Sequence, residues 1–187
     1  MKTPAILPIK HSNKAKTRLA KTLSLEDRKI LSYRMFNHVR KTCIRAGLRP
    51  VVVTADPFLL SKFGGVPDEG EDLNIAINKA IRLLDSEEFF IILPDLPLLQ
   101  AKSLQTIIDI DADYVVCPDL RMTGTNIVYV KNFKNFKPMF GENSFLKHLR
   151  QSAKAKIFYE LGTALDIDYP SDLSLLRLFT TGFPGEK

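Results

Sequence analysis

The chain has 187 residues, of which 45% are apolar and 26% charged, so it can bury a core and does not have the composition of a disordered protein. With 27 Lys and Arg against 21 Asp and Glu, its formal net charge is +6, which favours anionic partners such as nucleotides, phosphorylated metabolites or nucleic acid. Two cysteines are too few for a disulfide framework or a cysteine-based zinc site, and no apolar run approaches the roughly 20 residues of a membrane span. Prolines interrupt the apolar run at the N-terminus, which does not resemble a secretory signal, so we expect a soluble cytoplasmic protein with no membrane partner.

The first part of the chain predicts two strands, a long loop and a helix. A short apolar run over residues 5–9 is typical of a buried strand, and the polar stretch 10–22 has no period and predicts a loop. A helix follows over residues 24–46, because a capping-box-like pattern opens it and Gly47 is placed to end it. The apolar residues 50–54 predict the second strand.

The rest of the chain continues the alternation of helices and strands. Residues 73–84 have apolar side chains at steps of three and four and predict an amphipathic helix, and the uninterrupted apolar run 89–93 is typical of a central parallel strand. The remaining predictions are a helix near 104–108, strands over 114–117 and 126–130, a helix capped by Ser144 and reaching about residue 153, short strands over 157–159 and 164–165, and a helix over 169–179. This order predicts an α/β fold with a doubly wound, mostly parallel sheet, in one domain over residues 1–187 with a flexible tail at 181–187.

Charge is unevenly distributed along the chain. Residues 1–25 contain six bases and no acid, residues 56–119 contain 13 acids and four bases, and residues 131–156 contain seven bases and one acid. If the fold brings these segments to one edge, they form a cleft with basic walls and a carboxylate floor, which suits metal-assisted phosphate chemistry. The alternative is that they are ordinary solvated surfaces.

Charged side chains follow the predicted strands at their carboxyl ends, where ligands bind in open parallel sheets. They are bases after the first strand and aspartates after the central and last strands, namely Lys10, Lys16, Arg18, Asp95, Asp166 and Asp168. Lysine and arginine offset the charge of a nucleoside triphosphate, and one or two carboxylates hold the magnesium ion that phosphate chemistry needs. The pattern therefore predicts a nucleotidyl-transfer site.

Each of these residues also has a structural interpretation. Asp95, with a proline shortly before and after it, is equally typical of a turn or a helix cap, and Asp168 fits the N-cap of the last predicted helix. Lys16 and Arg18, taken alone, fit a solvated loop. His148 fits a half-buried helical residue better than a catalyst.

Eight short motifs follow one another along nearly the whole chain. They are Pro8-Ile9-Lys10, Ala15–Leu19, Leu23–Arg28, Gly70–Ala76, Asp95–Leu99, Pro118-Asp119 leading into Gly124–Asn126, Phe140–His148 and Asp166–Leu173. Together they resemble one family, the 2-phospho-L-lactate guanylyltransferases of deazaflavin coenzyme F-420 biosynthesis.

The resemblance implies an enzyme that joins GMP from GTP to 2-phospho-L-lactate and releases pyrophosphate, with phosphoenolpyruvate as the acceptor in some relatives. It implies the nucleotide-diphospho-sugar-transferase (GT-A) fold, a three-layer sandwich with helices on both faces of a mostly parallel sheet. It also implies Mg²⁺ as the cofactor, a cytoplasmic homodimer and no nucleic-acid partner.

The resemblance also assigns site residues. Thr125, Gly141 and Ser144 match the residues that hold the phosphorylated acid, and we add Asn74 to this substrate-binding set. The family's metal-binding acids correspond to Asp95, Asp166 and Asp168. Lys16 and Arg18 stand where such enzymes meet the triphosphate, and we expect Lys10 to offset charge together with them. A phosphate oxygen of the acceptor attacks the α-phosphorus, and no general base is needed because the second pKa of a phosphate is about 6.

Two other functions remain open at this point. A related nucleotidyltransferase with a sugar-phosphate or molybdopterin acceptor would carry a Gly-rich element after the first strand, which this chain lacks. A basic nucleic-acid-binding module is suggested by the alternating bases and phenylalanines of residues 131–137, although the acidic middle of the chain counts against it. The short segment around Gly64-Gly65 predicts that a strand expected there is reduced.

Overall fold

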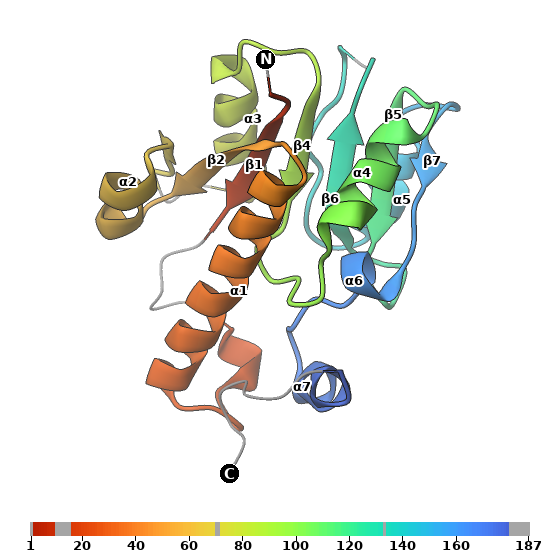
Figure 1. Cartoon of the computed structure of the whole chain (residues 1–187). Coiled ribbons are helices and arrows are strands. Elements are labelled where there is room, and N and C mark those ends of the chain that lie inside the picture. Colours follow the sequence, from red (N-terminus) through yellow and green to blue (C-terminus); the bar gives the residue numbers. More distant parts are fainter. Residues whose placement is uncertain (1, 10–15, 70–71, 133, 180–187) are drawn as a thin grey trace.

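The computed structural model describes residues 2–9, 16–69, 72–132 and 134–179, and within them the chain forms a seven-stranded sheet flanked by helices (Figure 1). The order of the strands across the sheet is β3-β2-β1-β4-β6-β5-β7. Their bounds are β1 (Pro4–Pro8), β2 (Arg49–Thr54), β3 (Val66–Pro67), β4 (Phe89–Ile92), β5 (Tyr114–Pro118), β6 (Thr125–Val130) and β7 (Lys156–Ile157).

The sheet is mostly parallel, as predicted, but one central strand runs the other way. β1 is parallel to β2 and β4, and β3 and β7 also pair in parallel with their neighbours. β6 is antiparallel to both β4 and β5 and is the exception within the mostly parallel sheet. The reason is the short connection over residues 119–124, since a parallel crossover takes a dozen or more residues.

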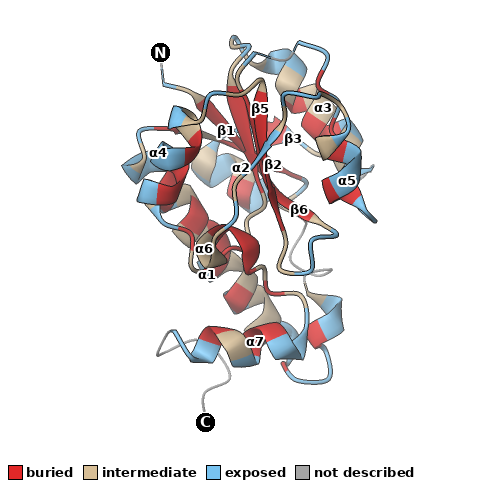
Figure 2. Cartoon of the chain, turned by 90° about the vertical axis from the view of Figure 1, so that its right-hand side faces the viewer, coloured by how far each residue is buried: buried red, intermediate tan, exposed pale blue. Residues whose placement is uncertain are grey.

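Helices cover both faces of the sheet and give the three layers that we predicted. Phe36 of α1 and Leu104 of α4 pack on one face, and Ile77 of α3 and Phe145 of α5 pack on the other. Figure 2 shows the buried sheet between helices that are buried on one side and exposed on the other. The bounds are α1 (Leu25–Arg45), α2 (Pro57–Phe63), α3 (Leu73–Leu83), α4 (Ala101–Asp109), α5 (Ser144–Leu149), α6 (Leu161–Ala164) and α7 (Pro170–Arg177), with a 3-10 turn η2 (Thr17–Leu19).

A separate apolar cluster joins η2, the N-terminal half of α1 and the segment leading into α7. Leu19, Leu31, Met35 and Ile167 are fully buried or nearly so within it. In Figure 1, α7 lies at the same level as the end of α1 that is farthest from the sheet. This cluster fixes two segments that are far apart in the sequence at the same edge of the sheet, which is where their polar side chains meet.

Two predictions near the C-terminus were wrong. Residues 164–165 are not a strand, because the Thr163 hydroxyl accepts the N–H of Glu160 and the chain turns into α6 instead. Ser144 is not a helix cap but the first residue of α5, and Asn143 precedes it in the left-handed conformation.

The C-terminal end of α5 and the start of α7 also differ from the prediction. α5 ends at Leu149 because the side chain of Gln151 pairs with the backbone of Lys137. Asp168 does not cap α7; Tyr169 precedes that helix, and the carboxylate of Asp172 accepts the N–H groups at its start.

The sequence reading missed α2 altogether. Its start has a clear signal, since Asp56 accepts the N–H groups of Phe58 and Leu59 and Pro57 occupies the first turn. β3, which follows α2, is reduced to two residues as predicted. Within the described residues no helix is long and apolar enough to cross a membrane.

Candidate functional site

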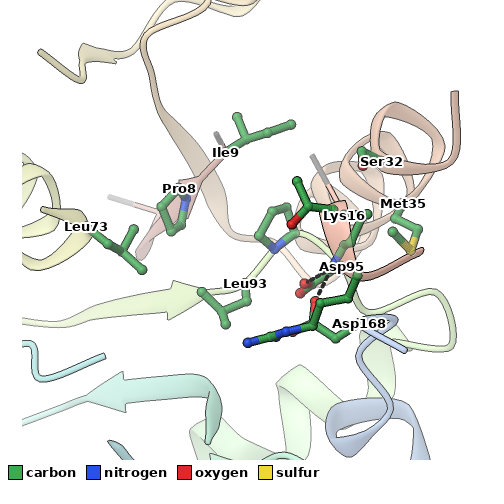
Figure 3. Close-up of a pocket in the computed structure, with 12 residues that line it drawn as sticks. Pro8, Ile9, Lys16, Ser32, Met35, Leu73, Leu93, Asp95 and Asp168 are labelled. Carbon is green, nitrogen blue, oxygen red and sulfur yellow. Dashed lines mark hydrogen bonds and ion pairs between the residues drawn. The ribbon is translucent and has the colours of Figure 1, made fainter. Parts of the chain in front are cut away.

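A cavity of about 410 Å³ opens at the carboxyl ends of β1 and β4. Lys16, Arg18, Asp95 and Asp168 line it together with apolar residues such as Leu73. Figure 3 shows Lys16, Asp95 and Asp168 gathered on one side of this cavity and Leu73 on the other. The volume falls in the range of small-molecule sites, and the charged wall suits a ligand that carries phosphates. The predicted base Lys10 lies outside the described residues.

Three carboxylates converge at the charged wall. Asp95, Asp166 and Asp168 each present an oxygen within 4.8 Å of the other two. One oxygen of Asp95 and one of Asp166 are buried without a hydrogen-bond partner. Burial, and then the charges of Asp95 and Asp168, raise the pKa of Asp166 to about 7. Crowded carboxylates with unsatisfied oxygens are the donor set that a divalent cation such as Mg²⁺ prefers, so these residues fit a metal ion.

Two bases pair with the same carboxylates. The Lys16 ammonium lies 2.5 Å from Asp95 Oδ2 and 2.9 Å from Asp168 Oδ1, and an Arg18 guanidinium nitrogen lies 2.7 Å from Asp168 Oδ2. Although burial opposes it, the charges of Asp95 and Asp168 raise the pKa of Lys16 above its ordinary value. At Asp168, burial acts to raise the pKa, but the charges and hydrogen bonds of Lys16 and Arg18 outweigh it and lower the pKa below its ordinary value. The bases and acids predicted from three separate places in the sequence therefore form one ionic cluster.

The backbone conformation of Lys16 shows that the cluster is built into the fold. Lys16 is a non-glycine residue in the left-handed region, with φ 48° and ψ 47°, and its side chain is only 10% exposed. Such a conformation costs free energy and persists where the surroundings hold it. The interpretation of Lys16 as a solvated loop residue is wrong, whereas the side chain of Arg18 is 59% exposed.

The segment that carries Asp166 and Asp168 is held from both sides. The N–H of Ile167 donates to the carbonyl of Asp95 at 3.3 Å, so the two carboxylate-bearing segments are tied together. Asp172 is almost fully buried and accepts the N–H groups of Asp168 and Tyr169 at 2.9 and 2.7 Å. Since the side chains of an extended segment alternate, Ile167 enters the apolar cluster while the aspartates on either side of it join Asp95 in the carboxylate group.

Arg121 is a residue that sequence reasoning missed. Its guanidinium donates to Asp172 at 2.9 Å and lies over the ring of Tyr169, 4.7 Å from the centroid. Arg18 also lies over this ring, at 5.1 Å. Arg121 follows the β5 strand end, which is the one signal in the sequence that could have pointed to it.

The residues assigned to the phosphorylated acid form a second group, which is not part of the cavity lining. Thr125 and Ser144 are buried, and the Thr125 hydroxyl is hydrogen bonded to His148 at 2.9 Å. Gly141 has φ 116°, and a Cβ atom on it would meet nothing within 4 Å. The side-chain amide of Asn74 pairs with the backbone of the residue before Gly141, and Asn74 follows Leu73 of the cavity wall.

The antiparallel strand β6 brings Thr125 to the same edge of the sheet as Asp95. In the β4–β6 register Ile92 lies opposite Ile127, and the N–H of Leu93 donates to the carbonyl of Asn126. Continued by one residue, this register sets Thr125 opposite the proline that precedes Asp95. Because β6 is antiparallel to β4, the first residue of β6 lies at the sheet edge where β4 ends.

Burial of His148 predicts a pH-dependent stability. Burial, and then the charge of Lys147, lower the pKa of His148 to about 4, whereas the imidazole of an unfolded chain titrates near 6.5. Below about pH 6.5 the unfolded state therefore binds a proton that the folded state does not, and stability falls as the pH drops towards 4. Asp166 acts in the opposite direction because its pKa is raised on folding, so the effect must be measured as a difference between two proteins.

We compare the free energy of unfolding of wild type with that of His148→Gln. The difference between the two proteins should be about 2 kcal/mol smaller at pH 5 than at pH 7. Urea unfolding of both proteins at both pH values measures this difference, in which the contributions of the aspartates cancel. The expectation fails if the difference is the same at the two pH values.

The sequence as a whole matches known proteins. A sequence model described as guanylyl transferase CofC like matches residues 3–183. A 2-phospho-L-lactate guanylyltransferase of Methanocaldococcus fervens is 34% identical over 179 residues, which cover 90% of this chain and 81% of that protein. A phosphoenolpyruvate guanylyltransferase of Thermobaculum terrenum is 28% identical over 190 residues, which cover 92% and 82%.

Solved structures share the fold at low sequence identity. A protein of Desulfovibrio desulfuricans, assigned as a nucleotide-diphospho-sugar transferase, superposes with a TM-score of 0.77 at 14% identity and covers 98% of this chain and 90% of its own. The manganese complex of Rv0371c from Mycobacterium tuberculosis superposes with a TM-score of 0.59 at 14% identity, covering 96% and 100%. These similarities show the nucleotide-diphospho-sugar-transferase fold that the sequence predicted.

Proposed function

Because this chain belongs to the guanylyl transferase CofC-like family and is therefore a nucleotidyltransferase, we propose that it transfers GMP from GTP to 2-phospho-L-lactate or phosphoenolpyruvate, in coenzyme F-420 biosynthesis. The observation that carries the proposal is the ionic cluster of Lys16, Arg18, Asp95, Asp166 and Asp168 at the wall of the cavity. It combines bases for a triphosphate with carboxylates for a metal ion, and nucleotidyl transfer needs both.

The three aspartates would hold Mg²⁺. Asp95 and Asp166 each bring a buried oxygen that has no other partner, and Asp168 brings an oxygen from the same edge. When bound, the ion offsets negative charge on the phosphates. The two aspartates that flank Ile167 differ in this role, because Asp166 Oδ1 has no partner whereas both oxygens of Asp168 pair with Lys16 and Arg18.

The bases neutralise the triphosphate, and the acceptor supplies its own nucleophile. Lys16 and Arg18, with Lys10 that precedes them in the sequence, offset the charge of GTP. An oxygen of the acceptor's phosphate bonds to the α-phosphorus while the bond from that phosphorus to the bridging oxygen breaks, and this oxygen departs with pyrophosphate. No proton has to be removed, because the attacking phosphate is already deprotonated near neutral pH.

We place the phosphorylated acid at Thr125, Gly141 and Ser144, with Asn74 supporting the loop between them. The open space beside Gly141 supports this placement, because a bare backbone can be approached closely there. The edge of the sheet shared by Thr125 and Asp95 supports it as well, since acceptor and nucleotide must meet at one phosphorus atom.

A screen of pyrophosphate release tests the proposal. GTP, ATP, CTP and UTP are each combined with 2-phospho-L-lactate, phosphoenolpyruvate or a sugar 1-phosphate in the presence of Mg²⁺. We expect release with GTP and one or both of the acids, and none without an acceptor. Release with the sugar phosphate alone would favour the alternative nucleotidyltransferase. Retention on heparin that GTP and Mg²⁺ do not affect would favour the nucleic-acid-binding alternative.

Substitution of Thr125 separates acceptor binding from nucleotide binding. Thr125→Val removes the hydroxyl at nearly constant volume, and loss of one hydrogen bond to a charged group lowers affinity roughly ten- to a hundredfold. We expect this loss for the acceptor, with GTP affinity unchanged, in calorimetric titrations of each ligand separately. Thr125→Ser keeps the hydroxyl and is the matched control. If Thr125→Val loses GTP affinity while acceptor affinity holds, the two subsites are reversed.

The homodimer and the cytoplasmic location that the resemblance implies remain predictions. Size-exclusion chromatography with light scattering tests the first of them: a mass of twice 21.1 kDa supports a homodimer, and a mass of 21.1 kDa contradicts it.

A further inference from the structure

His148 plays no part in the proposed chemistry, yet it is fully buried and completely hydrogen bonded. Its ring packs against Phe136 and Phe140, with centroid distances of 5.7 and 4.8 Å. Nδ1 lies 2.9 Å from the hydroxyl oxygen of Thr125, and Nε2 lies 2.9 Å from the backbone nitrogen of Met139. One ring therefore connects the start of β6 to the loop before α5.

The partners of the ring determine which nitrogen carries the proton. A backbone amide can only donate, so the N–H of Met139 requires that Nε2 of His148 is unprotonated. In the neutral imidazole the proton then lies on Nδ1, which donates it to the Thr125 hydroxyl oxygen. Because this hydroxyl accepts from the ring, its own hydrogen is available to a further acceptor, and the described part of the chain supplies none.

The same ring holds the backbone that leads to Gly141. Met139 is bound by His148 from α5, and both backbone groups of Phe140 are bound by the Asn74 side chain from α3, at 2.7 and 3.1 Å. Two successive residues are thus fixed by two different helices. Gly141 follows directly, with its backbone beside open space.

We propose that His148 is a positioning residue for an anionic phosphorylated acid, directing the hydroxyl hydrogen of Thr125 and holding the loop that presents Gly141. The inference rests on the proposed function, which places the acid at these two residues. The ring transfers no proton, because Nδ1 and Nε2 are both engaged within the protein. It acts on the acid only through the groups that it orients.

Two substitutions separate the two bonds of the ring. The amide of His148→Asn lies near the position of Nδ1 and can donate to Thr125, whereas the amide oxygen of His148→Gln reaches towards Nε2 and can accept from Met139. Each variant thus keeps one bond and loses the other. We expect both to weaken binding of 2-phospho-L-lactate and phosphoenolpyruvate roughly ten- to a hundredfold, and to bind GTP within about twofold of wild type.

His38→Asn is the matched control. His38 lies on α1 and its Nε2 donates to the carbonyl of Leu99 at 2.9 Å, so the substitution also removes a hydrogen-bonded imidazole. We expect it to leave acid affinity unchanged in the same calorimetric titrations. Folded His148 variants that bind the acids as tightly as wild type would overturn the proposal.

The tautomer of His148 can be measured without any substitution. The ring resonances of a merely structural histidine would not respond to the bound acid. In ¹H–¹⁵N spectra of the wild-type imidazole, we expect Nδ1 of His148 to be protonated and Nε2 to be an acceptor. Addition of phosphoenolpyruvate should then shift the Nδ1 resonance more than that of Nε2. A proton on Nε2, or no response of either resonance to the bound acid, would overturn the proposal.

The outcomes also separate this proposal from the proposed function. If wild type binds neither acid, the proposed function is contradicted, and the role of His148 falls with it. If wild type binds an acid and both His148 variants bind it equally well, only the role of His148 is contradicted.

Discussion

Asp95→Asn should lower guanylyl transfer by about two to three orders of magnitude and leave the fold intact. Asparagine has nearly the same volume but lacks the charge that Asp95 contributes to the carboxylate cluster. Oδ1 of Asp95 is buried without a partner, and Lys16, which pairs with Oδ2, keeps Asp168 as a second partner in the variant, so the substitution affects cation binding more than packing. The measurement is turnover as a function of Mg²⁺ concentration, with circular dichroism to show that the fold is retained.

Asp85→Asn is the matched control for this experiment, because Asp85 is an exposed acid away from the cluster. It removes the same charge from the chain and should leave turnover unchanged. Near-normal activity of Asp95→Asn at low Mg²⁺ would show that Asp95 does not hold the metal ion.

Lys16→Ala should weaken GTP binding roughly ten- to a hundredfold and also destabilise the protein. The ammonium of Lys16 is buried between Asp95 and Asp168, and its removal leaves Asp95 without an ionic partner, while Arg18 still pairs with Asp168. The expected loss of stability in EDTA is about 3 kcal/mol. Mg²⁺ should restore more stability to the variant than to wild type, because a cation would again offset the carboxylates.

Two neighbouring substitutions complete the Lys16 experiment. Arg18→Ala should weaken GTP binding with little loss of stability, because its side chain is 59% exposed and lies at the edge of the cluster. Lys21→Ala removes an exposed base from the same segment and should change neither quantity. Normal GTP kinetics of Lys16→Ala, combined with a large loss of stability, would make Lys16 a structural residue only.

Much of the sheet could be predicted because its signals are local. The uninterrupted apolar run 89–93 and the helical period of residues 73–84 are local patterns that tertiary contacts did not override. The antiparallel direction of β6 follows from the short connection 119–124 and not from the residues of the strand, so that connection is the only signal of it in the sequence. The short helix α2 lacked a long periodic pattern, although its Asp-Pro start was visible in the sequence.

The candidate site was predictable where it follows strand ends and unpredictable where it depends on long-range pairing. Asp95 and Lys16 were identified as candidates from their positions, but their ion pair joins residues that are 79 positions apart. The role of His148 could not be read from its helix, because its partners Thr125 and Met139 come from a strand and a loop. Hydrogen bonds of this kind are absent from any local pattern.

Transfer of GMP from GTP to the phosphate of a small acid is tested most directly by the fate of labelled oxygen. The enzyme is given GTP, Mg²⁺ and 2-phospho-L-lactate or phosphoenolpyruvate carrying ¹⁸O in its phosphate, and the products are followed by ³¹P NMR and mass spectrometry. We predict a guanylylated acid that keeps all of the label, including its new bridging oxygen, and unlabelled pyrophosphate. Unlabelled GMP from hydrolysis, or labelled pyrophosphate, would contradict the attack of the acceptor phosphate on the α-phosphorus of GTP.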